Sequence, residues 1–408
     1  MPELLELPQT ERQRIEELGA ADLVIGVFAP FTAQQFETIL ANVRDSIGTL
    51  YTHVRAIVIH PGDQPTPPLD DIRVLAVPAL KRDLAIDPAF ALSEAYHGLL
   101  AVGDFLHARA SALIVSDLDT VTPQWIYRLV RPVLELDFDI VAPCYFHDRF
   151  DGLVNTAIVA PFTRAMYGRQ LQHPLGPDFA ISAKFGKHLL ARAAKKHPRS
   201  LASFTVDAIC DGFEICQATV GERHYPPVDW MNQSAVLTQI LGPVFQETEL
   251  HAPQWQRIRG SHAVQSFAET PHICASQPPP GIQRMLESFQ IGFRNLQEIW
   301  GAVLPPGTLL ELGRLARTSA DHFRLPDRLW ARIVYDFALG HRLRTISPDH
   351  LIRAMTPLYL AWVASYVLDI ADAGTQAADA RIQELALAFE SSKPYFLSRW
   401  RWPDRFNP

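Results

Sequence analysis

The sequence predicts an α/β protein with a mostly parallel sheet, followed by a mostly α-helical C-terminal domain. From Ala21 to about Gln246, short apolar runs rich in β-branched residues alternate with stretches of helical period. Such alternation is typical of a parallel sheet with helices on both faces. From about Leu250 onward the strand-like runs vanish, and apolar residues recur at three- and four-residue spacing. We therefore predict two domains, 1–248 and 249–408.

The first domain is expected to contain short strands separated by amphipathic helices. The expected strands are ADLVIGVF (21–28), HVRAIVIH (53–60), DIRVLAV (71–77), SALIVSDLD (111–119) and ICQATVG (215–221). TAQQFETILANVRDSI and SEAYHGLLAVGDFLHA have the period of helices. Sheets of this kind bind ligands at the carboxyl ends of their strands, so the polar residues just past each strand are the candidates for a site.

The second domain is expected to be built from long helices separated by proline-rich turns. IQRMLESFQIGFRNLQEIWGAVL, RLWARIVYDFALGHRLR and PDHLIRAMTPLYLAWVASYVLDIADA have apolar residues at helical spacing. Aromatic residues at this spacing favour a core or an interface, so a homodimer through this domain is a hypothesis. The aromatic residues concerned are Trp330, Tyr335, Phe337, Tyr359, Trp362 and Tyr366.

Composition excludes several classes of protein. Of the 408 residues, 48% are hydrophobic and 20% charged, with a net charge of −7, which is typical of a globular protein and gives no support for nucleic-acid binding. The 4 cysteines include no CxxC pair, which fits a reducing cytoplasm. The acidic N-terminus lacks the features of a signal peptide. The apolar stretch from Pro357 to Leu368 is shorter than the roughly 20 residues of a membrane span, so we expect a soluble, cytoplasmic protein.

The strongest local signal for chemistry is ALIVSDLDT (112–120). An apolar strand is followed by Asp117 and Asp119, and the alternation of side chains along an extended chain points both carboxylates to one side. Two carboxylates at a strand end suit Mg²⁺ or Mn²⁺, which can bridge the phosphates of a nucleotide. The alternative is structural, because acidic residues often cap helices and Thr122-Pro123 has the pattern of a helix start.

Two further segments carry polar residues just outside expected elements. HPLGPDFAIS (173–182) has the proline and glycine of a turn, followed by Asp178. ICQATVGERHYPP (215–227) is a strand followed by a polar turn that contains His224. A histidine in isolation is more often structural than a metal ligand, and the loop alone indicates only a connection between two elements.

Taken together, these three motifs resemble one family. An apolar strand ending in Asp-x-Asp, a Pro-Leu-Gly-x-acid loop and a strand followed by Glu-Arg-His resemble the retaining GT-A glycosyltransferases that make mannosylglycerate, glucosylglycerate and glucosyl-3-phosphoglycerate. The resemblance covers about residues 21–245. It implies a GT-A fold, which is a Rossmann-like, mostly parallel nucleotide-binding sheet.

The resemblance implies a metal site at the Asp-x-Asp motif, Asp117-Leu118-Asp119. Asp119 would bind Mg²⁺ or Mn²⁺, and His224 would complete the metal shell. Asp117 would lie near the ribose or the donor sugar, and it is also a candidate metal ligand. Leu118 would lie with it in the donor site.

The resemblance also implies a donor site that several segments share. The loop from His173 to Asp178 would line the donor sugar and acceptor, with Leu175 and Gly176 on the donor. Asp207 in TVDAIC would grip sugar hydroxyls. The resemblance further places Pro30 at the nucleotide base, Lys81 at the diphosphate, and Asp63, in the turn after the second strand, in the donor site.

The segment HDRFDGLVNTAIVAPFTRAMYG (147–168) falls where the family binds its acceptor. Arg149 would hold an acceptor carboxylate through both arms of its guanidinium group. The phosphoglycerate enzymes have an arginine where this chain has Leu153, and Arg-Asn where Tyr225-Pro226 follows His224. Both differences count against a phosphorylated acceptor. Pro177, in place of a glycine, suggests a different acceptor pocket.

These observations predict a metal-dependent retaining glycosyltransferase. It would move a hexose from a nucleotide-diphosphate sugar, a GDP- or UDP-hexose, to a small carboxylate acceptor such as glycerate. Asp178 and Asp207 are the acidic candidates for catalysis, although front-side attack without a protein nucleophile is favoured. One alternative is a sugar-phosphate nucleotidylyltransferase, but FAPFTAQQF lacks the glycine-rich basic loop of that class. The other is a sugar-nucleotide-binding protein without catalysis.

Overall fold

A computed structural model describes residues 9–62, 72–77, 80, 88–193, 201–225, 227–268, 273–274, 277–371 and 374–403. The chain forms two compact units, each assembled from three chain segments. Unit 1 comprises Met1–Phe146, His173–His224 and Val264–Pro271. Unit 2 comprises His147–Gln172, Tyr225–Ala263 and His272–Pro408.

This division differs from the single boundary predicted between residues 248 and 249. That position lies inside helix α8 (Ser234–Leu250), which belongs entirely to unit 2. Helix α5 (Ala160–Tyr167) also belongs to unit 2, because it packs against α16 (Thr375–Arg401). The ring centroids of Phe162 in α5 and Phe396 in α16 are 6.5 Å apart. Helical segments that precede the predicted boundary therefore have their packing partners far along the chain.

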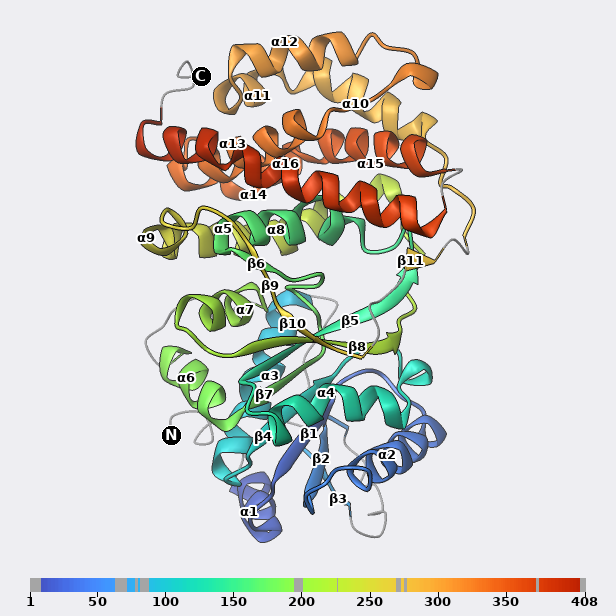
Figure 1. Ribbon diagram of the computed structural model, residues 1–408, viewed down its shortest axis with the longest axis vertical. Coiled ribbons are helices and arrows are strands. Elements are labelled where there is room, and N and C mark those ends of the chain that lie inside the picture. The colour runs from blue at the N-terminus through green and yellow to red at the C-terminus, as the bar shows by residue number, and fades with distance from the viewer. Residues whose placement is uncertain are drawn as a thin grey trace. The chain divides into compact units, whose positions relative to one another are not determined.

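Unit 1 contains the mostly parallel sheet that the sequence predicts (Figure 1). Its strands have the order β10-β8-β5-β7-β4-β1-β2-β3, and β7 alone is antiparallel to its neighbours in the described sheet. The strands are β1 (Leu23–Val27), β2 (Ala56–His60), β3 (Arg73–Ala76), β4 (Ala110–Ile114), β5 (Ile140–Asp148), β7 (Phe179–Ser182), β8 (Ile215–Glu222) and β10 (Gln265–Phe267).

The predicted strands at 21–28, 53–60, 71–77 and 215–221 are confirmed as β1, β2, β3 and β8. The predicted strand 111–119 is shorter, because β4 ends at Ile114. Asp117 and Asp119 therefore lie beyond the strand, at the 3₁₀ turn η3 (Leu118–Thr120). The last two residues of β5, His147 and Asp148, belong to unit 2 and pair with β11 (Ile273–Cys274).

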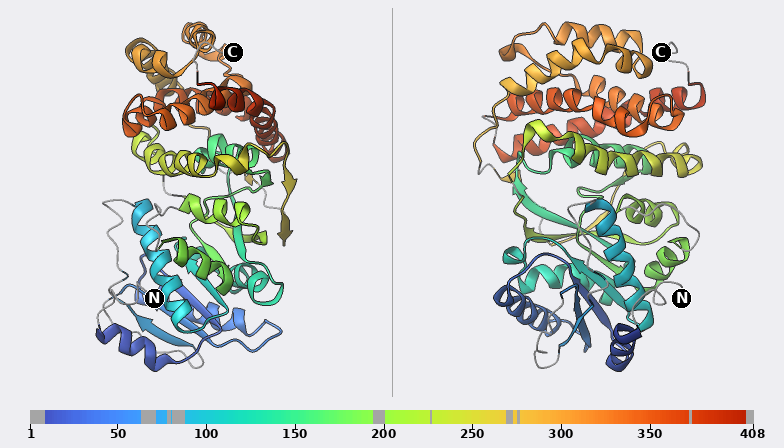
Figure 2. Two further views of the ribbon diagram at one scale, coloured as in Figure 1. Left: turned by 90° about the vertical axis from the view of Figure 1, so that its left-hand side faces the viewer. Right: turned by 180° about the vertical axis from the view of Figure 1, so that it is seen from behind.

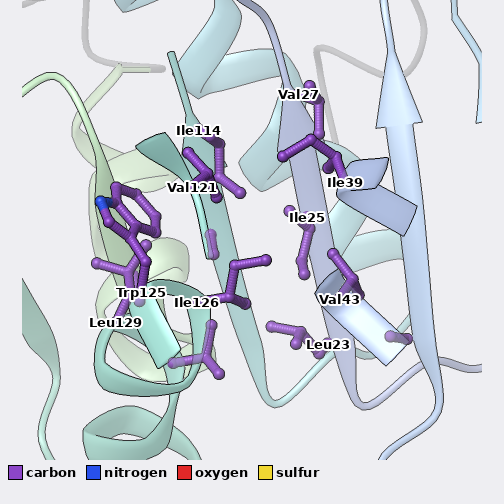
Figure 3. Close-up of a cluster of buried hydrophobic side chains, with 14 of the residues drawn as sticks. Leu23, Ile25, Val27, Ile39, Val43, Ile114, Val121, Trp125, Ile126 and Leu129 are labelled. Atoms are coloured by element: carbon purple, nitrogen blue, oxygen red, sulfur yellow. The ribbon is translucent and has the colours of Figure 1, made fainter. Parts of the chain in front are cut away.

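Helices cover both faces of the sheet in unit 1. On one face, α2 (Ala33–Ile47) and α4 (Pro123–Glu135) bury apolar side chains against β1 and β4 (Figure 3), and the same cluster includes residues of β8. The caps of both helices are visible in the sequence, since Thr32 caps α2 and Thr122 caps α4 with Pro123 at its first turn. The other face is covered by α1 (Gln9–Leu18), α3 (Pro88–Phe105), α6 (Ala183–Ala193) and α7 (Leu201–Cys210).

Unit 2 is mostly helical, as predicted for the C-terminal part, and its helices lie in successive layers (Figures 1 and 2). The helices not yet introduced are α9 (Ala252–Trp255), α10 (Gln283–Asn295), α11 (Gln297–Val303), α12 (Pro306–Leu315), α13 (Asp327–Leu343), α14 (Pro348–Ala354) and α15 (Thr356–Ile370). Shorter elements are η4 (Asn155–Val159), a single π-helical turn, η5 (Trp230–Asn232), η6 (Ala320–His322), and the strand pair β6 (Arg169–Gln170) and β9 (His262–Ala263).

The aromatic residues predicted for a core or an interface lie in the core of unit 2. All six from Trp330 to Tyr366 have 1% or less of their surface exposed. Trp362 stacks on Tyr366 with ring centroids 5.1 Å apart. The segment Pro348–Ile370 is long and apolar enough to cross a membrane, but 83% of its most apolar window is buried inside the protein. It is packed as a core helix would be.

Candidate functional site

The candidate site lies at the carboxyl edge of the sheet in unit 1. Strands β1, β2, β4, β5 and β8 are parallel, so the residues that follow them meet at one edge. Pro30 follows β1, Asp117 follows β4, and His224 follows β8. Chain topology therefore gathers three of the predicted site residues at the same edge.

The acidic turn after β4 presents two carboxylates to solvent. Leu118 is 5% exposed and packs into the core, while Asp117 and Asp119 on either side of it are exposed. The turn is closed by hydrogen bonds, since Thr120 donates to the Asp117 carbonyl through its amide at 3.0 Å and its hydroxyl at 2.7 Å. The Asp119 amide donates to Oδ1 of Asp117 at 3.2 Å. Burial of Leu118 is thus what turns both acids outward.

Asp117 and His224 lie together, although 107 residues separate them in the chain. Oδ2 of Asp117 is 3.4 Å from Nδ1 of His224, and both side chains are largely exposed. Two atoms that bind one ion at about 2.1 Å each lie about 3 Å apart, so this pair can share a divalent ion with little movement. The imidazole and carboxylate are ligand types that suit Mn²⁺ and, for the carboxylate, Mg²⁺.

Asp119 is held by a residue that the sequence did not indicate. Nε2 of Gln35 donates to Oδ1 of Asp119 at 2.9 Å, while Oε1 of Gln35 accepts from the Thr32 amide at 3.0 Å. Among the described residues, ligand atoms of Asp117, Asp119 and His224 do not all lie within 4.8 Å of one another. The structure therefore pairs His224 with Asp117, and the pairing with Asp119 stays a prediction. The capping-box spacing of Thr32 and Gln35 indicates only the helix start, so the contact of Gln35 with Asp119 had no signal in the sequence.

An aromatic cluster backs the turn at Pro30, where the resemblance places the base. Pro30 is exposed, and the neighbouring Phe31 stacks on Phe36 with ring centroids 4.5 Å apart. His60 lies at the end of β2, and its ring centroid is 4.9 Å from that of Phe36. Its Nδ1 accepts a hydrogen bond from the Gly62 amide at 3.1 Å. Burial lowers the pKa of His60, which keeps the ring neutral and its Nδ1 able to accept. Asp63 and Lys81 lie outside the described residues.

The HPLGPD loop forms a tight turn beside β5. The Gly176 amide donates to the His173 carbonyl at 3.2 Å, and Leu175 between them is half-buried. A Cβ on Gly176 would lie 3.1 Å from Cγ of Pro143, so a larger residue there would push against the strand. The Pro174 carbonyl accepts a hydrogen bond from Oγ1 of Thr205 in α7 at 2.6 Å, which ties the loop to the helix that carries Asp207.

The two acids predicted for catalysis have partners inside unit 1. Asp178 is completely buried, and both of its carboxylate oxygens accept hydrogen bonds from residues near the sheet edge. Asp207 is 3% exposed, and its Oδ1 lies 3.1 Å from Nη2 of Arg192 in α6. Burial leaves neither acid an open surface from which to attack a donor sugar, and for Asp178 the hydrogen bonds themselves supply another role.

In unit 2, Arg149 has partners other than the predicted acceptor carboxylate. Nη1 donates to the Ile370 carbonyl at 2.8 Å and Nη2 to the Ala371 carbonyl at 2.9 Å. These carbonyls lie at the C-terminal end of α15, where a cation is favoured. The guanidinium therefore caps a helix. Leu153, which the sequence analysis compared with an arginine of the phosphoglycerate enzymes, is buried at 3% exposure.

We expect the Arg149→Ala substitution to act mainly on stability. Two hydrogen bonds from a charged donor are lost at a helix end, so the free energy of unfolding should fall by about 2 kcal/mol. Urea denaturation measures this directly. A protein of unchanged stability with a raised KM for the acceptor alone would instead support the acceptor role predicted from the resemblance.

No protein-family profile and no curated protein matches the chain. Among solved structures, it is similar to a mycobacterial protein (18% identity over 57% of this chain and 77% of that chain, TM-score 0.40). It is also similar to glucosyl-3-phosphoglycerate synthase from Mycobacterium tuberculosis, solved with Mn²⁺, UDP and glucosyl-3-phosphoglycerate (16% identity, 57% and 83% covered, TM-score 0.38). A third similar structure is mannosyl-3-phosphoglycerate synthase from Rubrobacter xylanophilus, with 15% identity over 61% of this chain and 80% of that chain and a TM-score of 0.37. At TM-scores below 0.5 these likenesses assign no activity to this chain.

Proposed function

We propose that this protein is a metal-dependent retaining glycosyltransferase that uses a nucleotide-diphosphate sugar as donor. The observation that carries the proposal is the approach of His224 to Asp117, at 3.4 Å, across the carboxyl edge of a parallel sheet. A structural acidic cap after β4 would not require a histidine from the end of β8 beside it. Both side chains are exposed, as metal ligands that meet a substrate must be.

Asp117 and His224 would hold Mg²⁺ or Mn²⁺, with Asp119 joining them once its hydrogen bond to Gln35 is released. A bound ion of this kind supplies positive charge that neutralises the diphosphate as the glycosidic bond breaks. The exposed turn at Pro30, backed by Phe31 and Phe36, would receive the base. A GDP- or UDP-hexose is the expected donor.

Retention of configuration is expected to proceed by front-side attack. Asp178 is fully buried with both oxygens occupied, so it does not serve as a nucleophile. Asp207 is nearly buried beside Arg192 and is better placed to orient sugar hydroxyls than to attack. The acceptor hydroxyl would then attack on the face that the diphosphate leaves, and the departing phosphate oxygen would take its proton.

A small hydroxy acid such as D-glycerate is the proposed acceptor. The similar solved structures are named for glucosyl- and mannosyl-3-phosphoglycerate synthesis, so phosphoglycerate is the natural competitor. Leu153 is buried where the phosphoglycerate enzymes are expected to carry an arginine, which favours the unphosphorylated acid. The acceptor assignment thus depends on residues of unit 2, and the donor assignment on residues of unit 1.

The first test is a thermal-shift panel of UDP-, GDP- and ADP-sugars with and without Mg²⁺ or Mn²⁺. Ligands that bind the folded state raise the Tm by mass action, so a shift that needs both one nucleotide sugar and the metal is expected. Product formation with D-glycerate or 3-phosphoglycerate then identifies the acceptor. No shift with any pair would remove the glycosyltransferase proposal. Binding without release of nucleoside diphosphate would indicate a sugar-nucleotide-binding protein.

A further inference from the structure

Two of the three motifs behind the predicted site meet at one buried carboxylate, that of Asp178, and the third is connected to it through Tyr145. Oδ1 accepts from the Val115 amide at 2.7 Å and the Ser116 amide at 3.0 Å. Oδ2 accepts from the Tyr145 hydroxyl at 2.5 Å and from the Ser116 hydroxyl. Four donors surround a side chain with no exposed surface, so Asp178 has no capacity left for a substrate.

The register of the sheet explains why Asp178 reaches these donors. β7 runs antiparallel to β4, and its first residue Phe179 pairs with Leu113. Asp178 precedes β7, and its side chain takes the amides of the two residues that follow β4. Strand β4 therefore ends at Ile114. The next two residues, Val115 and Ser116, which directly precede Asp117, have their amides bound by the Asp178 side chain instead of by the backbone of a neighbouring strand.

The same carboxylate reaches the histidine side of the site through Tyr145. The Arg223 guanidinium lies over the Tyr145 ring, with Cζ 5.0 Å from the centroid, and the Arg223 amide donates to the Phe146 carbonyl at 3.1 Å. Arg223 directly precedes His224. A charged group over an aromatic face is attracted to it, so Tyr145 holds the segment that carries His224 as well as the Asp178 carboxylate.

The HPLGPD loop completes the arrangement at its other end. The ring of His173, the first residue of this loop, lies edge-on to Tyr145 with centroids 5.6 Å apart. One carboxylate and one phenol thus contact the segment before Asp117, the segment before His224 and the loop between them in the sequence. All of these contacts lie within unit 1.

We propose that Asp178 is a positioning residue, which acts with Tyr145 to set the spacing of Asp117 and His224 so that they can share a metal ion. This inference rests on the metal site of the proposed function. It replaces the catalytic role predicted for Asp178 from the sequence. It adds Tyr145 and Ser116, to which the sequence analysis assigned no role, and it gives a role to Arg223, the arginine of the motif that contains His224.

The test compares Asp178→Asn and Tyr145→Phe with a matched control, Asp139→Asn. Asparagine keeps the shape of Asp178, but its amide NH₂ would replace the oxygen that accepts from the hydroxyls of Ser116 and Tyr145. Tyr145→Phe removes a single hydrogen bond to the same carboxylate. Asp139 is a buried acid of the same unit, 4% exposed, that accepts from Ser182 Oγ, Lys184 Nζ and the Glu214 amide at 2.8–3.1 Å. It contacts the last residue of β7, at the opposite end of that strand from Asp178.

Two readouts are taken for each protein: Mn²⁺ affinity by calorimetry, and hydrogen exchange of the amides of Val115–Asp119 and Glu222–His224. We expect Asp178→Asn to weaken Mn²⁺ binding about ten-fold or more, with a smaller loss for Tyr145→Phe. Exchange in both segments should rise about ten-fold in Asp178→Asn, because hydrogen bonds to a charged acceptor are lost. Asp139→Asn should change neither readout.

Exchange and affinity that stay at wild-type levels in both Asp178→Asn and Tyr145→Phe would overturn the inference. Equal effects in Asp139→Asn would also overturn it, because they would reflect general loosening of unit 1. A wild-type protein that binds no Mn²⁺ contradicts the proposed function, and the inferred metal spacing falls with it. The exchange measurement then still decides whether Asp178 joins the two segments.

Discussion

The His224→Ala protein is expected to bind Mn²⁺ at least about 100-fold more weakly than the wild type and to lose a comparable factor in kcat/KM. The physical reason is the loss of one of the two ligands that the fold already brings together, at 3.4 Å. Asp117→Asn should give a loss of the same size, since it removes the charge of the other ligand. Calorimetric titration with Mn²⁺ and steady-state kinetics measure the two effects separately.

His188→Ala is the matched control for this experiment. His188 also pairs with a carboxylate in unit 1, with Nε2 2.8 Å from Oδ2 of Asp211, and it is partly exposed, at 30% against 65% for His224. It lies on α6, away from the ends of β4 and β8. A wild-type Mn²⁺ affinity in His224→Ala would exclude this histidine from the metal site. Loss of affinity in both variants would point to an effect that is not specific to the site.

The second large effect is expected in unit 2, where Asp336→Ala should lower the free energy of unfolding by about 3–5 kcal/mol. Asp336 in α13 is 1% exposed, accepts from the Tyr395 hydroxyl at 2.8 and 2.9 Å, and lies 3.0 Å from Nε of Arg399 in α16. Arg399 is 2% exposed, so above about pH 7, where Asp336 is ionised, removal of the acid takes the carboxylate from a buried guanidinium. Urea denaturation followed by tryptophan fluorescence measures the loss.

Asp327→Ala is the control, because it joins the same two helices near the surface. Asp327 in α13 binds Arg381 in α16 at 2.6 and 2.7 Å, with side chains 18% and 13% exposed. Because solvent screens this pair more, a loss of about 1 kcal/mol is expected. Equal losses in the two variants would show that burial of the ion pair does not set its contribution.

Asp336 also predicts a pH dependence of stability. Burial raises the pKa of Asp336 from 3.8 to about 7, against the opposing effects of Arg399 and Tyr395. Between these values the folded protein binds a proton that the unfolded chain releases. The stability that comes from protonation of Asp336 is therefore fully present below about pH 4, and it is lost as the pH rises through about 7. The difference in unfolding free energy between wild type and Asp336→Asn should follow this slope, and a constant difference would contradict it.

The sequence predicted β1, β2, β3 and β8, and β4 in part, because their apolar runs are continuous and bounded by turn residues. It did not predict β5, β7 or β10, and β10 lies beyond Leu250, where no further strands were expected. It also placed Thr122 and Pro123 at a helix start, since capping needs only local chemistry. The family resemblance brought His224 to the Asp117-Leu118-Asp119 motif, and the parallel strands that end at one edge explain why the two segments meet. These features depend on local pattern or on topology, which a single sequence contains.

Other features depend on which partner a side chain contacts in the folded protein, and the sequence alone did not reveal these partners. Asp178 and Arg149 are both polar residues in turns, yet Asp178 turns inward to backbone amides and Arg149 to helix carbonyls. Gln35 reaches Asp119 from 84 positions away in the chain. The predicted domain boundary at residue 248 fails to match the two units for the same reason, because the change from strand-like to helical patterns along the sequence does not reveal that α5 packs against α16.

The interleaving of the two units has a consequence for synthesis on the ribosome. The edge strand β10 (Gln265–Phe267) pairs with β8, so the sheet of unit 1 is incomplete until the chain has emerged past Phe267. α5 is made early, but α16, which covers it, ends at Arg401. The apolar face of α5 must therefore wait for the last helix, which favours slow folding and dependence on chaperones. A stalled or prematurely terminated chain would expose that face and be a substrate for proteolysis.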